Sequence, residues 1–130
     1  MNLGRMKLKA IKALNNVMEV HEDELMRIWG AKSLGKIDIG NLRSVQTLLY
    51  FLKNGKDETI QDAAAKSLTS LLHTEQLKLM IHEIRDYLNQ VRKRDFNSYK
   101  ICQKVVWHCS KNLSYPEFYD IWNKKSTKFV

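Results

Sequence analysis

The 130-residue sequence contains one proline, five glycines and two cysteines, and each of these low counts excludes a class of protein. So little proline and glycine leaves few residues for the many turns of an all-β fold. No apolar run approaches the ~18 residues that a membrane span needs, and no long apolar stretch follows the basic residues near the start, as a secretory signal requires. Two cysteines without such a signal indicate reduced thiols in a cytoplasmic protein.

The sequence does contain enough apolar residues for a core, and its formal net charge is +8. An apolar share of 44% is too high for a disordered chain, and this length suits one compact domain or part of a longer array. The charge is uneven, because residues 76–104 carry seven Lys or Arg against three Asp or Glu, whereas residues 21–75 are almost neutral. This regional basic excess raises the question of a nucleic-acid partner.

An internal repeat organises the first part of the chain. Asp23-Glu24 recurs as Asp57-Glu58, and Ala31-Lys32-Ser33-Leu34 recurs as Ala65-Lys66-Ser67-Leu68, both at an offset of 34 residues. A fixed offset of this size with helical periodicity is typical of a right-handed solenoid of helical hairpins. The chain then opens with the second helix of a partial repeat, which favours a piece of a longer protein.

Periodicity, caps and breaks together predict an all-α fold of seven helices. Asp23 and Asp57 suit helix starts, because a short carboxylate accepts hydrogen bonds from the first backbone N–H groups. Ser114 with Glu117 forms a capping box at the last helix. The predicted ranges are Lys7–Glu19, Asp23–Lys36, Leu42–Lys53, Asp57–Leu72, Glu75–Val91, Phe96–Asn112 and Tyr115–Lys124.

Two stretches of the sequence resemble one known family. Ala31–Ile37, followed by Gly40-Asn41, resembles the HEAT-like repeats in the C-terminal part of cyanobacterial NACHT-type signal-transduction NTPases of the STAND class. The stretch Val-Trp-His-Cys-Ser-Lys-Asn-Leu-Ser-Tyr-Pro-Glu-Phe-Tyr at 106–119, with Trp122, is similar to the terminal helical module of that family. The resemblance covers about residues 7–124. The second repeat departs from the pattern, since it has Thr69-Ser70 in place of Gly35-Lys36.

This resemblance implies a HEAT-like α-solenoid over residues 1–73, with a partial first repeat, and a C-terminal helical capping module over residues 74–130. It implies only the partner- or trigger-sensing end of such a protein, because the chain lacks a Gly-rich loop with Lys and Ser/Thr for a nucleotide. The expected function is a non-catalytic protein-interaction or sensor module in NTPase signalling or antiphage defence. No enzyme activity, cofactor or membrane association is expected.

The cysteines are candidates for chemistry but are predicted to pack in the core. Cys102 and Cys109 lie two helical turns apart, too far for a disulfide, and share an apolar stripe with Val105 and Val106. His108 beside Cys109 suggests a Cys/His pair, yet adjacent helical residues point about 100° apart. The four histidines also lack the spacing of a zinc-binding helix, so no catalytic or metal site is predicted.

Two groups of residues are predicted to contact a protein partner or an anion. The first group lies on the repeat faces and comprises Arg27, Arg43 and Gln61. The second is the basic cluster Lys78, Arg85, Arg92, Lys93, Arg94, Lys100 and Lys104. Because Lys78, Arg85 and Arg92 are spaced by seven, they are expected on the solvent face of one helix, opposite its apolar stripe. The alternative function is a basic HEAT-like solenoid that binds nucleic acid through this cluster, although Glu83, Asp86 and Asp95 interrupt it.

The aromatic residues leave two further alternatives. Trp107, Tyr115, Phe118, Tyr119 and Trp122 have helical spacing, which favours a cap on the core over an exposed recognition surface. Trp29 occupies the position of Ala63 in the next repeat, so it either fills a groove or lies at a contact surface. A third class of function is an enzyme, either a HEAT-like DNA glycosylase or a bilin lyase. A glycosylase needs a carboxylate with aromatic groups, and the first repeats contain no Asp with neighbouring Trp and Tyr.

Overall fold

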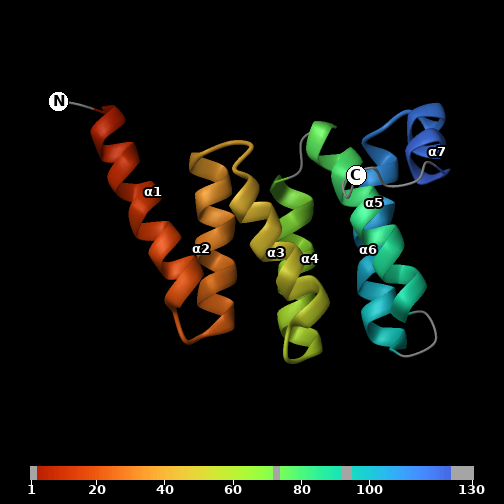
Figure 1. Ribbon diagram of the computed structural model, residues 1–130, viewed down its shortest axis with the longest axis horizontal. Coiled ribbons are helices and arrows are strands. Elements are labelled where there is room, and N and C mark those ends of the chain that lie inside the picture. Colours follow the sequence, from red (N-terminus) through yellow and green to blue (C-terminus); the bar gives the residue numbers. More distant parts are fainter. Residues whose placement is uncertain (1–2, 72–73, 92–94, 124–130) are drawn as a thin grey trace, which may run out of the picture. The chain divides into compact units, whose positions relative to one another are not determined.

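The computed structural model is all-α, as predicted (Figure 1). It describes residues 3–71, 74–91 and 95–123, with side chains for 4–71, 80–91 and 95–123, and these residues form seven helices and no strand. The helices are α1 (Leu3–Val20), α2 (Glu24–Ile37), α3 (Leu42–Asn54), α4 (Glu58–Leu71), α5 (Thr74–Val91), α6 (Phe96–Lys111) and α7 (Tyr115–Asn123). None of the described helices is long and apolar enough to cross a membrane.

The chain divides into two compact units, unit 1 (Met1–Leu71) and unit 2 (Leu72–Val130). In unit 1 successive helices run antiparallel and lie side by side, from red α1 to green α4 in Figure 1. Helix α2 packs against α1, α3 and α4, and α3 also packs against α4. The fully buried large side chains of unit 1 are Met18, Leu34, Leu48, Phe51, Leu52 and Leu68.

The 34-residue offset relates two helices of equal length, α2 and α4, each of 14 residues. Asp23 Oδ1 accepts a hydrogen bond from the Leu25 N–H at 2.9 Å, and Asp57 Oδ1 accepts one from the Ile60 N–H at 3.0 Å. Both aspartates therefore cap helices as predicted. Leu34 and Leu68, which the offset also pairs, are both fully buried. The stacking of such hairpins into a HEAT-like solenoid stays a prediction.

Two glycines of α2 allow neighbouring helices to approach closely. A Cβ atom at Gly30 would lie 3.1 Å from Val17 Cγ1 and 3.2 Å from the backbone nitrogen of Met18, both in α1. A Cβ atom at Gly35 would lie 2.6 Å from Leu71 Cδ1 in α4. The turn after α2 uses Gly40 at φ +86°, a conformation that other residues rarely adopt.

Unit 2 consists of α5, α6 and α7, and α5 packs against both of the other helices. Asp95 caps α6, since its Oδ1 accepts from the Ser98 N–H at 3.2 Å. At the start of α7, Ser114 Oγ accepts from the Glu117 N–H at 3.3 Å, as the predicted capping box requires. The buried apolar side chains described in unit 2 are Met80, Ile81, Ile84, Leu88, Val91, Ile101, Cys102, Val105, Cys109 and Ile121.

Candidate functional site

The three candidate residues on the repeat faces have different environments. Arg27 lies within unit 1, where its Nε donates to the Met18 carbonyl at 2.8 Å and its guanidinium lies 5.0 Å from the centre of the Phe51 ring. Gln61 is buried, and its Nε2 donates to the Leu52 carbonyl at 3.3 Å. Arg43 is exposed and pairs with Glu19. Among these three, only Arg43 lies on the open surface.

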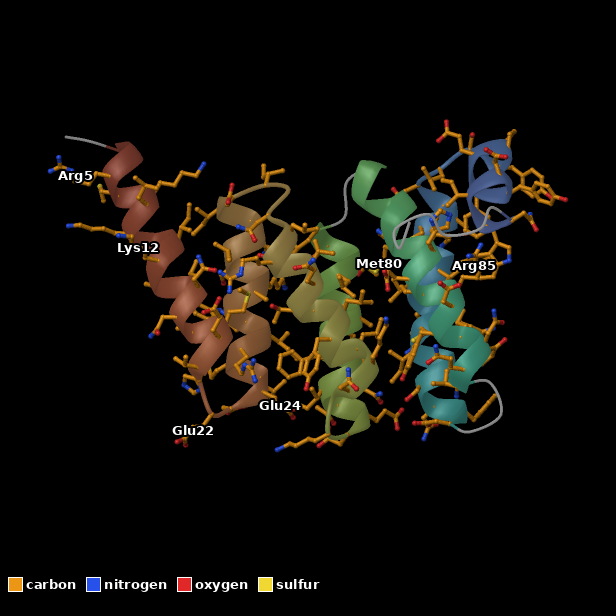
Figure 2. The ribbon with its side chains drawn as sticks, viewed as in Figure 1. Arg5, Lys12, Glu22, Glu24, Met80 and Arg85 are labelled. Atoms are coloured by element: carbon orange, nitrogen blue, oxygen red, sulfur yellow. The ribbon has the colours of Figure 1, made fainter. Side chains whose placement is uncertain are left out.

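The basic cluster is not a continuous patch among the described side chains. Arg85 is expected on a solvent face, but its side chain is only 16% exposed. Its Nη1 donates to the Trp122 carbonyl at 2.6 Å, because the end of α7 lies over this part of α5. Arg85, which is labelled in Figure 2, also pairs with Asp86. Lys100 and Lys104 are exposed on α6. The side chains of Lys78, Arg92, Lys93 and Arg94 lie outside the described residues.

His82 and Arg85 together hold the last turn of α7, and we call this pair the α7 clamp. His82 Nε2 lies 2.8 Å from the Ile121 carbonyl oxygen, one residue before the carbonyl that Arg85 binds. Since a carbonyl only accepts, Nε2 carries the proton. The last carbonyls of a helix have no partner within the helix and carry partial negative charge, which a guanidinium offsets. The clamp therefore fixes α7 on α5.

The two cysteines belong to the core of unit 2, as predicted. Cys102 and Cys109 are free thiols with no exposed surface. Burial raises the pKa of the Cys109 thiol from 9.0 to about 12, partly offset by a backbone hydrogen bond, so the thiol is protonated at neutral pH. His108 is directed toward Asn112, whose Nδ2 lies 3.4 Å from its Nε2. In the part of the chain that the structure describes, no three His, Cys, Asp or Glu side chains gather as a metal site would need.

The expected aromatic cap is wrong for three of its five residues. Trp107 is 63% exposed, Tyr115 76% and Tyr119 59%. Only Phe118 and Trp122 are half-buried, with their rings stacked at 5.7 Å between centres. The reason is that α7 has nine residues and buries only Ile121, so a single side chain of α7 reaches the core.

An apolar groove of about 850 Å³ is formed within unit 2 by α5, α6 and α7. Its walls include Leu88 of α5, Val106 and Trp107 of α6, and Phe118 and Trp122 of α7. Lys100 and Lys104 also line it. This groove was not predicted from the sequence, although Tyr99 and Val106 are spaced by seven, which places both on one helix face, and Trp107 follows Val106. We call it the α6–α7 groove.

One comparison with known proteins found a match. Residues 95–123 match the family model described as NACHT C-terminal Cysteine and Histidine-containing, NCC-H. The matched segment spans α6 and α7 and contains Cys102, His108 and Cys109. The predicted resemblance is therefore confirmed for this segment, which is similar to the C-terminal region of NACHT-type proteins. No curated protein and no solved structure matches the chain.

Proposed function

We propose that this chain is a non-catalytic interaction or sensor module that associates with the NTPase part of a NACHT-type system, in signalling or antiphage defence. The observation that carries the proposal is the match of residues 95–123 to the C-terminal module of NACHT-type proteins. Both cysteines of that segment are buried, and the raised pKa of Cys109 keeps its thiol protonated, which supports a role in packing over one in thiol chemistry.

Exposed apolar side chains in unit 1 support a protein partner. Leu25, Met26 and Trp29 lie within one turn of α2, and their exposures are 45%, 39% and 52%. Trp29 therefore lies at the surface, which favours the contact role left open for it. Large apolar side chains gathered on a surface mark interaction sites, and Trp is enriched among the residues that dominate binding. The proposed mechanism is rigid presentation of helix faces to a partner.

Nucleic acid is the second candidate, and Lys100 and Lys104 beside exposed Trp107 are the observation that favours it. These two lysines alone neutralise about two phosphates, and they contribute only about −2 to the slope of the logarithm of affinity against that of salt. We place the protein partner first, because the exposed apolar side chains of α2 support it.

The test pairs this chain with the NACHT-type NTPase region encoded in the same reading frame or in a neighbouring gene, expressed separately. Association is measured by analytical ultracentrifugation and the effect by the rate of NTP hydrolysis with and without the chain. We expect a complex and an altered rate, both reduced by Trp29→Ala or Trp107→Ala and retained in the exposed control Tyr50→Ala. The proposal is wrong if no such NTPase associates, or if the chain alone removes bases from DNA or transfers a bilin.

A further inference from the structure

The α6–α7 groove runs along a second face of α6 that the core of unit 2 does not use. The core face carries Ile101, Cys102, Val105 and Cys109, all buried. The groove face carries Tyr99, Gln103, Val106, Trp107 and Ser110. At 100° per residue the two faces are centred roughly 130° apart, so α6 presents one apolar face inward and another into the groove.

The length of the groove corresponds to a short helix. From Tyr99 to Ser110 the face advances eleven residues, which is about 16 Å at 1.5 Å per residue, or three helical turns. Phe118 and Trp122 of α7 form the opposite wall, and Leu88 of α5 also lines the groove. A groove with apolar walls and this length suits the apolar stripe of a docked helix, read at positions i, i+3 or i+4, and i+7.

The charges at the groove have one sign. Lys100 and Lys104 are one turn apart on α6, both exposed, and no Asp or Glu is among the described residues that line the groove. At 100° per residue both lysines lie on the flank of the groove face that is turned away from the core. A partner with carboxylates one turn apart along its own flank complements this pair.

We propose that the α6–α7 groove binds an amphipathic α-helix of a partner protein, with apolar anchors on one face and Asp or Glu along the flank that meets Lys100 and Lys104. This inference rests on the proposed function, because it names the site and the partner class for that interaction. The seven residues after Asn123 carry three lysines, and a second copy of the chain carries +8, so charge favours neither as the occupant.

The ring contacts favour a helix over a stacked nucleobase. Phe118 and Trp122 stack on each other, and the Lys111 ammonium lies 5.1 Å from the centre of the Trp107 ring. Ring faces that already have partners offer less area for bases to stack on. Apolar side chains of a docked helix would pack against the groove walls between these rings. They would leave both the Phe118–Trp122 stacking and the Lys111–Trp107 contact in place.

The experiment selects binders from an unbiased library of 18-residue peptides on an Ala/Gln helical background, using the full chain. The expected pool is acidic, with apolar residues at helical spacing. The strongest peptide should bind about 30-fold more weakly to Trp107→Ala and about tenfold more weakly to the double variant Lys100→Glu/Lys104→Glu. The matched controls are Tyr50→Ala and Lys9→Glu/Lys12→Glu, which make comparable changes at exposed positions of unit 1.

The three tryptophan indoles locate the binding site independently of these variants. In a ¹⁵N spectrum the Trp107 and Trp122 side-chain signals should shift on peptide addition, and the Trp29 signal should stay in place. A shift of Trp29 alone, a basic or unpatterned pool, or an empty pool overturns the groove inference. So does displacement of the peptide from the groove by a 15-nucleotide oligo-dT or by anionic phosphatidylglycerol vesicles at lower concentration. A complex with a NACHT-type NTPase that Trp107→Ala leaves intact retains the proposed function and removes only this inference.

Discussion

The two units hold their helices together by different means. In unit 1, long helices meet over glycines and buried aliphatic side chains, as at Gly30 and Gly35. In unit 2, the nine-residue α7 buries only Ile121, and the α7 clamp binds its last carbonyls instead. Burial of one Ile side chain contributes about 1.5–3 kcal/mol, which is small against the cost of ordering a helix of nine residues. A short terminal helix therefore needs polar contacts where longer helices rely on packing.

The largest expected effect tests the packing of unit 1. Leu34→Ala and Leu68→Ala should each lower the free energy of unfolding by about 2–5 kcal/mol, because both side chains are fully buried. Urea denaturation measures the loss, with exposed Leu42→Ala as the control. If one of these two variants lowers the free energy of unfolding by less than about 1 kcal/mol and the other by more, Leu34 and Leu68 are not equivalent packing positions of a repeat.

The next prediction tests the close approach of α1 to Gly30 of α2. Gly30→Leu should destabilise unit 1 by about 1–3 kcal/mol, because the new side chain meets Val17 and the backbone of α1. Thermal unfolding and hydrogen exchange in α1 and α2 report it. Ala13→Leu, at an exposed position on α1, adds comparable bulk without the clash. Equal stability of the two variants would contradict the role assigned to Gly30.

In unit 2 the matching change removes the Arg85 half of the α7 clamp. Arg85→Ala should cost about 1–3 kcal/mol, since the Trp122 carbonyl loses a charged donor. Faster hydrogen exchange in α7, with exchange in α2 unchanged, is the specific readout. Exposed Arg43→Ala, which loses only a surface ion pair, should cost less than about 1 kcal/mol. If exchange in α7 stays at the wild-type rate, the clamp does not hold this helix.

Loss of a helix cap should lower stability less, and by the same amount at the two aspartates that the 34-residue offset relates. Asp23→Ala and Asp57→Ala should each cost about 1 kcal/mol, because each removes an acceptor for a backbone N–H in the first turn. Exposed Glu22→Ala is the control for charge. Chemical denaturation that separates the two cap variants by more than about 1 kcal/mol would contradict their equivalence.

The last effect is a pH dependence that comes from a buried thiol of unit 2. The folded state holds the Cys109 proton up to a pKa of about 12, whereas the ordinary value is 9.0, so the folded state binds more protons between these pH values. The stability from this thiol is complete below pH 9 and is lost as the pH rises toward 12. The urea midpoint should fall more between pH 8 and pH 10 in the wild type than in Cys109→Ala; equal falls would contradict the raised pKa.

The helices were predictable because their signals are local. Asp23, Asn41 and Asp57 each precede a helix start and accept from a backbone N–H within three residues, so a short stretch of sequence contains both partners. The predicted start of α1 at Lys7 is four residues late. Asn2, a residue type favoured at helix starts, directly precedes Leu3, and the prediction did not use this signal.

The candidate site was less predictable because its contacts are distant in sequence. Arg85 was expected in solvent, and the carbonyl that it binds lies 37 residues away. Arg27 and Gln61 are similar, since each donates to a carbonyl of another helix nine residues away. The spacing of a side chain along its own helix says which face it occupies, but not which helix end lies over that face.

The α7 clamp also has a consequence for the order of assembly during synthesis. Arg85 leaves the ribosome 37 residues before Trp122, an interval of about 2–7 s at 5–20 residues per second. Late in that interval α5 and α6 have emerged while the wall that Phe118 and Trp122 supply is still being made. A nascent chain therefore carries half of the groove for about 0.6–2.4 s, the time from Ser110 to Trp122 at the same rate, and a helical ligand finds the complete site only once Trp122 has emerged.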